Sequence, residues 1–205
     1  VTQLTEIADS PQEWEKVLQW SQEHSPHVTC ALGLHPYFAD QWKPELEHEL
    51  KEKSTLPAVV AIGEIGLDYA KCPLDPKIQK TALEKMLEMA LQTRLPVILH
   101  CRDAYHDLFP ILMNFYGNRS PVRRFHGVIH CFSGTIQEAE QGVALGFALG
   151  IDGPITYPKN HALRAAATKV GIQVLLLETD SPYLPVQIAR GTRNEPKFIP
   201  NIAGE

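Results

Sequence analysis

The sequence predicts one α/β domain over residues 1–205, in which parallel strands alternate with helices and close into a (β/α) barrel. Short apolar runs recur at intervals of roughly 30 residues, and stretches with helical periodicity separate them. The runs are apolar almost throughout, as expected of parallel strands that are covered on both faces. Polar residues of the kind found in catalytic sites end most of these runs, a distribution that the carboxyl-terminal face of a barrel requires.

The apolar runs give the expected strands in order. They are Val28–Leu34, Ala58–Ile65, Val97–His100, Gly127–Cys131, Phe147–Leu149 and Val174–Leu177, and a further strand is expected near Val1–Ile7. No G-x-G-x-x-G motif follows an early strand, which argues against a doubly wound dinucleotide-binding sheet. These strands fall short of the eight that a closed barrel needs, so we expect truncation, chiefly at the N-terminal side. The chain begins with Val1 rather than Met and ends at Glu205 with no helix expected after the last motif, so we expect both ends to be truncated.

Capping residues predict where several helices begin and end. Ser10-Pro11-Gln12-Glu13 and Thr135-Ile136-Gln137-Glu138 have the pattern of a capping box, and Asp75-Pro76 is expected to open another helix. Gly146 and Gly171 occupy positions that are typical of helix ends.

Composition and charge narrow the classes of function. Hydrophobic residues make up 44% and charged residues 21% of the chain, which is typical of a globular protein. The sequence has neither an apolar run of bilayer-spanning length nor a signal peptide, so we expect a cytoplasmic location and no membrane partner. The net charge of -5 offers no global attraction to nucleic acid, so local basic groups or a metal would have to hold such a substrate. No obligate protein partner is evident.

Ligand-type side chains end four of the expected strands, namely Glu64, His100, His130 and Asp180, and His35 is a fifth candidate. Strand ends converge on one pocket in a barrel, and two imidazoles with two carboxylates suit one or two divalent ions such as Mg²⁺, Mn²⁺ or Zn²⁺. Such ions activate water for hydrolysis at neutral pH. Glu64 could bridge two ions, and Asp180 could orient or deprotonate the nucleophilic water.

Each of these side chains also has a purely structural interpretation. A single histidine at a strand end is more often a hydrogen-bonded structural residue, but four ionisable residues at four apolar strand ends are hard to explain by packing. Arg102 lies two residues beyond His100, where its guanidinium could hold a phosphate. Cys101 and Cys131 are expected to point away from the pocket into the core. The remaining histidines are expected to be solvated: His24, His27, His48, His106, His126 and His161.

Six motifs in order resemble those of the TatD family of metal-dependent deoxyribonucleases. They are Gly33-Leu34-His35-Pro36, Gly63-Glu64-Ile65-Gly66-Leu67-Asp68, His100-Cys101-Arg102-Asp103-Ala104, His130-Cys131-Phe132-Ser133-Gly134, Glu178-Thr179-Asp180-Ser181-Pro182-Tyr183 and Arg193-Asn194-Glu195-Pro196.

This resemblance implies an amidohydrolase-like TIM barrel and 3′ to 5′ exonuclease or related DNase activity, with RNA as an alternative substrate. It also implies that divalent metal is bound by Glu64, His100, His130 and Asp180. His35 and Arg102 would lie near the substrate phosphate. Asn194 and Glu195 would contact substrate at the mouth of the site.

One departure from the family pattern leaves two interpretations open. Many family members have a His-x-His pair on the first barrel strand, and these 205 residues contain none. The pair lies upstream of Val1, or the chain resembles members that lack it.

Two other functions compete with the nuclease. The first is an amidohydrolase-like enzyme that opens a small cyclic amide or lactone, since the same metal chemistry serves acyl and phosphoryl centres. A bridging Lys at a strand end would favour it, and the sequence shows none there. The second is a binding or structural protein that keeps a metal site without turnover.

Overall fold

The computed structural model describes residues 2–205, which form two compact units: residues 2–127, the first unit, and residues 128–205, the second unit. In both units strands alternate with helices along the chain. That residues 1–205 behave as a single domain stays a prediction from the sequence.

The first unit contains four strands, and each pairs in parallel with the next along the chain. The strands are β1 (Leu4–Ala8), β2 (Val28–Leu32), β3 (Val59–Asp68) and β4 (Val97–Arg102). All four were predicted, although β3 and β4 continue further than expected. Their extra length matters, because it carries Asp68 and Arg102 as strand residues to the edge where the candidate site lies.

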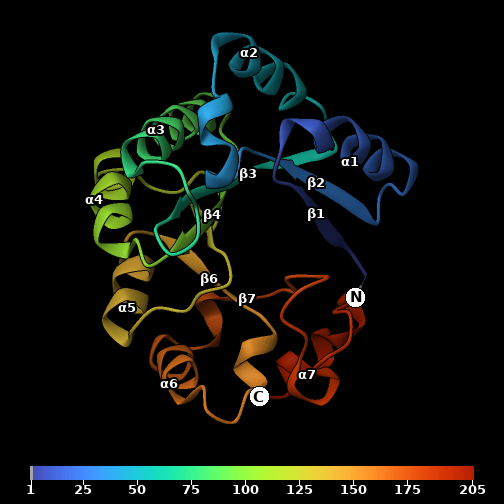
Figure 1. Cartoon of the computed structure of the whole chain (residues 1–205), viewed down its shortest axis with the longest axis vertical. Helices are drawn as coiled ribbons and strands as arrows, with labels where there is room; N and C mark the ends of the chain where they lie inside the picture. Colours follow the sequence, from blue (N-terminus) through green and yellow to red (C-terminus); the bar gives the residue numbers. More distant parts are fainter. Residues whose placement is uncertain (1) are drawn as a thin grey trace. The chain divides into compact units, whose positions relative to one another are not determined.

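The helices of the first unit cover its strands on the outside (Figure 1). They are α1 (Pro11–Glu23), α2 (Pro44–Lys53), α3 (Pro76–Thr93) and α4 (Tyr105–Tyr116), with a 3-10 helix, η1 (Pro36–Gln41), after β2. Asp75 caps α3 as predicted, because its carboxylate accepts the N–H of Lys77 at 2.7 Å. The predicted capping box at Ser10 is wrong. Ser10 makes no side-chain cap on α1, and the Glu13 carboxyl is hydrogen-bonded to Asp9 instead.

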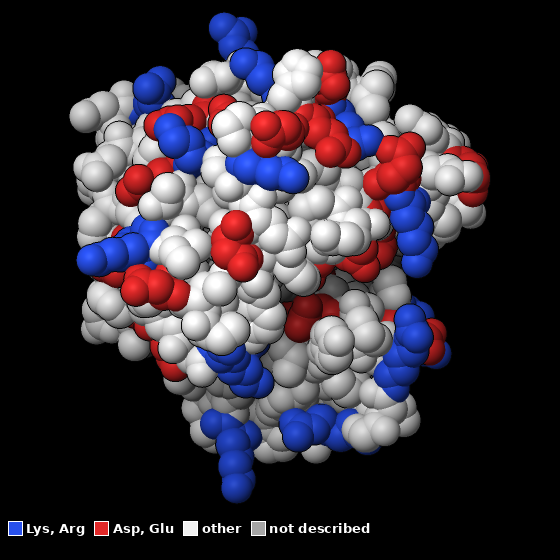
Figure 2. Space-filling view, turned by 45° about the horizontal axis from the view of Figure 1, so that its top comes forward, with Lys and Arg blue, Asp and Glu red and all other residues white. Residues whose placement is uncertain are grey.

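Charges of both signs are mixed on the surface around α2, which comes forward at the top of Figure 2. The Lys53 ammonium lies 2.6 Å from a carboxylate oxygen of Glu15 and 3.7 Å from one of Glu49. Exposed pairs of this kind contribute little to stability. Because acidic groups accompany the basic ones here, this helix offers no continuous track of positive charge to a phosphate backbone.

The second unit is built from β6 (Phe147–Ile151) and β7 (Leu175–Leu177), which pair in parallel with Leu149 opposite Leu175. Strand β5 (Gly127–Ile129) spans the boundary between the units and is shorter than predicted, because Cys131 has a positive φ of 46°. The helices are α5 (Ile136–Ala144), α6 (His161–Val170) and α7 (Ile199–Ala203), with short 3-10 helices η2 (Gly153–Thr156), η3 (Ile172–Val174), η4 (Gln187–Ala189) and η5 (Pro196–Phe198).

The helix caps predicted for the second unit are present in the structure. Thr135 and Glu138 form the predicted capping box at the start of α5, with each side chain bonded to the other's backbone N–H. Gly146 and Gly171 follow α5 and α6 with φ of 84° and 82°, a conformation that side chains with a Cβ rarely adopt.

Among residues 2–205, no helix combines the length and the apolar character that a crossing of a lipid bilayer demands.

One histidine that was expected to be solvated is buried. His126 lies against the ring of Tyr116, with ring centroids 4.5 Å apart, and its Nε2 is 3.2 Å from the Arg119 carbonyl. Its own carbonyl accepts the N–H of Val97 at the start of β4. Burial lowers the pKa of His126, because the charged imidazolium loses its hydration there.

This burial predicts an acid-sensitive fold. A histidine with a lowered folded-state pKa favours the neutral form, so its contribution to stability is present above the unfolded pKa and is lost as the pH falls through 6.5. Chemical denaturation of the wild type at a series of pH values should show stability decreasing below that point. In His126→Gln the decrease should be smaller, and equal pH profiles for the two proteins would contradict this prediction.

Gln79 links α3 to the end of β3. Its side chain is buried, accepts the N–H of Asp68 at 2.9 Å and donates to the carbonyls of Asp68 and Leu74 at 3.2 and 3.0 Å. Gln79→Met would leave these backbone groups without their partner and should lower the free energy of unfolding by about 2–4 kcal/mol in urea titrations. The matched control on the same helix is Gln92→Met, because Gln92 is exposed; an equal loss in both variants would refute the role given to Gln79.

Candidate functional site

The end of β3 brings two carboxylates to one face of the strand. Glu64, Gly66 and Asp68 alternate along β3, so their side-chain positions share a face. A Cβ at Gly66 would lie 2.0 Å from the carbonyl oxygen of His100, which only glycine avoids. This close approach of β3 to β4 places the imidazole of His100 between the carboxylates of Glu64 and Asp68.

His100 contacts a carboxylate with each ring nitrogen. Its Nδ1 lies 2.7 Å from Oε1 of Glu64, and its Nε2 lies 3.2 Å from Oδ2 of Asp68. Asp68 is fully buried and is itself held by the N–H groups of Ala70 and Lys71, at 3.0 and 2.8 Å. Because Asp68 is fixed by the backbone, it also fixes the orientation of the His100 ring and directs Nδ1 toward Glu64.

The pKa of Asp68 shows how the charges in this cluster balance. Burial raises the pKa of Asp68, but the hydrogen bond from the Lys71 N–H and the positive charges of His100 and Arg102 lower it more strongly. The pKa therefore lies below its usual value, and Asp68 is an ionised partner for His100.

His35 completes a cluster of three potential metal ligands in the first unit. Its Nε2 lies 3.4 Å from Nδ1 of His100 and 3.9 Å from Oε1 of Glu64. One donor atom from each side chain lies within 4.8 Å of the other two, so the cluster could hold a metal ion. Both nitrogen and carboxylate donors are present, as divalent transition metals prefer.

The hydrogen bonding of His35 nevertheless differs from that of His100. His35 precedes η1, and its Nδ1 accepts the backbone N–H of Tyr37 at 3.3 Å. A neutral imidazole that accepts at Nδ1 carries its proton on Nε2, the nitrogen that faces the cluster. Metal binding through that nitrogen would require the other tautomer and the loss of the bond to Tyr37. The arrangement therefore favours His35 as a hydrogen-bond donor beside the ligands Glu64 and His100.

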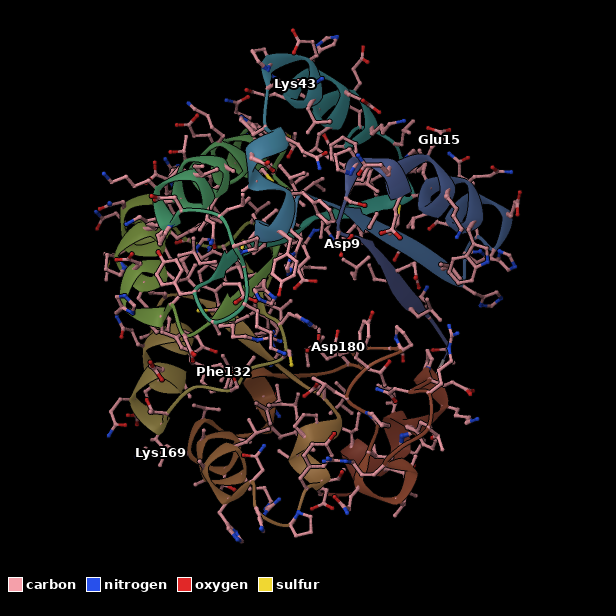
Figure 3. All side chains as sticks on the ribbon, in the orientation of Figure 1. Asp9, Glu15, Lys43, Phe132, Lys169 and Asp180 are labelled. Carbon is pink, nitrogen blue, oxygen red and sulfur yellow. The ribbon has the colours of Figure 1, made fainter. Side chains whose placement is uncertain are left out.

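Two further side chains surround this cluster. Arg102, at the end of β4, is partly exposed and places Nη1 3.5 Å from Oδ2 of Asp68. Asp9 follows β1 in Figure 3 and was missed by the sequence analysis, although it also ends a strand. Burial, a hydrogen bond to Glu13 and the charge of Glu64 raise the pKa of Asp9 to about 6. Its carbonyl accepts the N–H of His35 at 2.8 Å.

The second unit repeats the pattern of a histidine between two carboxylates. Nδ1 of His130 lies 3.0 Å from Oε1 of Glu178, and its Nε2 lies 3.8 Å from Oδ1 of Asp180, which is labelled in Figure 3. Glu178 also accepts the N–H of Cys131 at 2.6 Å. A Cβ at Gly150 would lie 2.5 Å from Oε1 of Glu178, so the glycine leaves room for this carboxylate on β6.

Cys131 differs from its predicted position in the core. Its positive φ turns the chain after β5, and its thiol donates to Oδ2 of Asp152 at 3.2 Å, at the carboxyl end of β6. Burial and the neighbouring carboxylates raise the pKa of Cys131, so the thiol is no nucleophile. Burial, opposed by the Cys131 hydrogen bond, raises the pKa of Asp152 to about 7. Cys101 is buried as predicted.

Asn194 and Glu195 lie after the last strand of the second unit. The Asn194 amide is buried and donates to the carbonyls of Tyr183 and Leu184, at 2.7 and 3.3 Å. It thus holds the loop that follows Asp180. Glu195 pairs with Lys197 at 2.8 Å. That these two residues contact substrate stays a prediction.

The structure therefore gathers Glu64, His100 and His35 in the first unit and His130 with Asp180 in the second. The carboxylates that orient the histidines, Asp68 and Glu178, had no role in the sequence analysis although both stand inside quoted motifs. His100 and His130 each face two carboxylates, and such an arrangement favours a positive charge between the groups. A divalent cation meets this requirement, and the donors present fit one.

Comparisons with known proteins identify the family to which the chain belongs. A family model described as TatD related DNase matches residues 1–205. The chain is 38% identical to a 3′-5′ ssDNA/RNA exonuclease TatD from Edwardsiella piscicida, covering 98% of this chain and 75% of the relative. It is 35% identical to the protein of that name from Citrobacter rodentium, covering 88% and 68%.

Solved structures give the same result for the fold. The crystal structure of a TatD homologue from Escherichia coli K12 superposes with a TM-score of 0.89 at 32% identity, covering 100% of this chain and 77% of that chain. A hydrolase of the TatD family from Entamoeba histolytica, at 24% identity and a TM-score of 0.75, supports the fold alone. The predicted barrel class and the predicted resemblance are confirmed, and the chain belongs to the TatD-related DNase family.

Proposed function

We propose that this chain is a metal-dependent phosphodiesterase that removes nucleotides from single-stranded nucleic acid in the 3′ to 5′ direction. The single observation that carries the proposal is the pairing of each strand-end histidine with two carboxylates in a chain of the TatD-related DNase family. The names of the relatives supply the substrate class, with DNA as the proposed substrate and RNA as the alternative.

Four side chains would hold divalent metal in this proposal. In the first unit they are Oε1 of Glu64 and Nδ1 of His100, and in the second unit Nε2 of His130 and Oδ1 of Asp180. A bound cation would supply Lewis acidity and a water of lowered pKa. One or two ions of Mg²⁺, Mn²⁺ or Zn²⁺ suit these donors.

Two further side chains would bind substrate, and one of the four proposed ligands would also accept a proton. His35 would donate from Nε2 to a phosphate oxygen, because its Nδ1 is engaged by the Tyr37 N–H. Arg102, partly exposed beside Asp68, would hold the same phosphate through its guanidinium. Asp180 would accept the proton of the attacking water at its carboxylate. A cytoplasmic location stays a prediction from the sequence.

Opening of a cyclic amide or lactone is the less favoured function. A solved structure that carries the name amidohydrolase, an uncharacterized protein from Saccharomyces cerevisiae, is 20% identical and supports the fold alone. The relatives that support a reaction are named as nucleases. Assaying a cyclic amide beside labelled single-stranded DNA would decide between the two functions.

Removal of either proposed catalytic carboxylate should abolish nuclease activity. Glu64→Gln and Asp180→Asn should each lower kcat on 5′-labelled single-stranded DNA by about 100- to 10,000-fold, while circular dichroism shows an intact fold. Chelation should abolish wild-type cleavage, and Mg²⁺ or Mn²⁺ should restore it. Glu88→Gln, on the surface of α3, is the matched control and should retain activity. Full activity in either site variant would remove that residue from the reaction.

Asp68 should affect metal binding without being a ligand. In Asp68→Asn an amide oxygen can still accept the N–H groups of Ala70 and Lys71, but the amide nitrogen then faces the Nε2 proton of His100. Calorimetric titration of metal-free protein with Mn²⁺ should show about 10- to 100-fold weaker binding. Unchanged affinity in the folded variant would show that Asp68 does not orient His100.

A further inference from the structure

Tyr37 is an exposed aromatic residue beside a cluster that is otherwise largely buried. The residue is 39% exposed, although Leu34, Pro36 and Ala39 around it are buried. Its ring meets the ring of His35 edge to face, with centroids 4.8 Å apart and an interplanar angle of 72°. Because its backbone N–H is also bonded to His35, Tyr37 contacts this histidine through both its ring and its backbone.

The side chains around Tyr37 are of the kinds that bind the base and the phosphate of a nucleotide. Burial and the negative charge of Asp68 raise the pKa of Tyr37, whereas the positive charge of Arg102 lowers it. Arg102 is itself partly exposed and bonded to Asp68. A chain of contacts links the exposed ring to this guanidinium. The Tyr37 ring meets the ring of His35, whose Nε2 lies 3.4 Å from Nδ1 of His100. Nε2 of His100 in turn lies 3.2 Å from the Asp68 carboxylate that pairs with Arg102. Aromatic rings stack on nucleobases whatever their sequence, and guanidinium groups bind phosphates.

Exposure of an aromatic ring is not by itself a sign of binding, since single apolar residues are common on protein surfaces. Trp20 illustrates this in the same unit. It is 37% exposed on α1 and its ring contacts His24, away from every proposed ligand. Tyr37 differs in its neighbours rather than in its exposure, and Trp20 provides a matched control.

We infer that Tyr37 is a specificity-determining residue whose ring stacks on the terminal nucleobase while His35 and Arg102 take the adjacent phosphate. The inference rests on the proposed function and adds the contact that selects single strands. A base can stack on the ring only after it leaves its own helix stack, so a paired terminus would bind less well than an unpaired one.

The test compares Tyr37→Ala, Tyr37→Phe and Trp20→Ala in a Glu64→Gln background that binds without cleaving. Fluorescence anisotropy with a 5′-labelled oligodeoxynucleotide gives the dissociation constants. Tyr37→Ala should weaken binding about 5- to 100-fold, while Tyr37→Phe and Trp20→Ala stay within about twofold of the background protein. The same oligonucleotide with an abasic 3′ nucleotide should bind Tyr37→Ala and the background protein equally.

Each other outcome overturns the inference. An equal loss on normal and abasic oligonucleotides would mean that Tyr37 acts by holding His35, and unchanged binding in Tyr37→Ala would mean that no base stacks there. Mn²⁺ titration of Tyr37→Ala, Tyr37→Phe and Trp20→Ala made in the wild-type protein, with Glu64 present, verifies that the ligand cluster is intact. If the wild type neither binds nor cleaves single-stranded DNA, the proposed function fails as well. If it does both and only the Tyr37 comparison is negative, the inference fails alone.

Discussion

The candidate site depends on carboxylates that the backbone fixes before any ligand arrives. Asp68 accepts two N–H groups in the turn after β3, and Glu178 accepts the N–H of Cys131. Each then orients one imidazole, so the direction of the ring lone pair follows from local hydrogen bonds rather than from the metal. Preorganisation of this kind lowers the cost of binding a cation, because the ligands lose little further freedom.

The positions of the strands and of two site residues could be predicted from the sequence, because buried parallel strands appear as short apolar runs. The apolar runs predicted the position of each strand, and the capping pattern of Thr135 and Glu138 predicted the start of α5. The ends of the runs also pointed to Glu64 and His100, since strand ends meet at one edge. For Glu64 and His100, the type of residue and its position near the end of a strand were sufficient to predict a place in the site.

The missed residues depended on geometry that residue types do not encode. Asp68 was invisible as a partner of His100 because β3 was expected to end at Ile65, three residues too early. Cys131 was assigned to the core by simple alternation, which its positive φ interrupts. The failed cap at Ser10 has a similar origin, since Glu13 is hydrogen-bonded to Asp9 and not to the backbone of Ser10. Which of several possible hydrogen-bond partners a side chain takes depends on the three-dimensional arrangement, and the order of residues does not reveal it.

The close contact of β3 with β4 at Gly66 has a consequence for engineering. Because the carbonyl of His100 occupies the place of any side chain at this position, the spacing between Glu64 and the imidazole cannot be adjusted by substitution there. A designer who wants the scaffold to accept a larger ion must work from the layer behind, through Asp68 and its neighbour Gln79. The size of the ion would thus be tuned through the residues that support the donors, Asp68 at the end of β3 and Gln79 on α3.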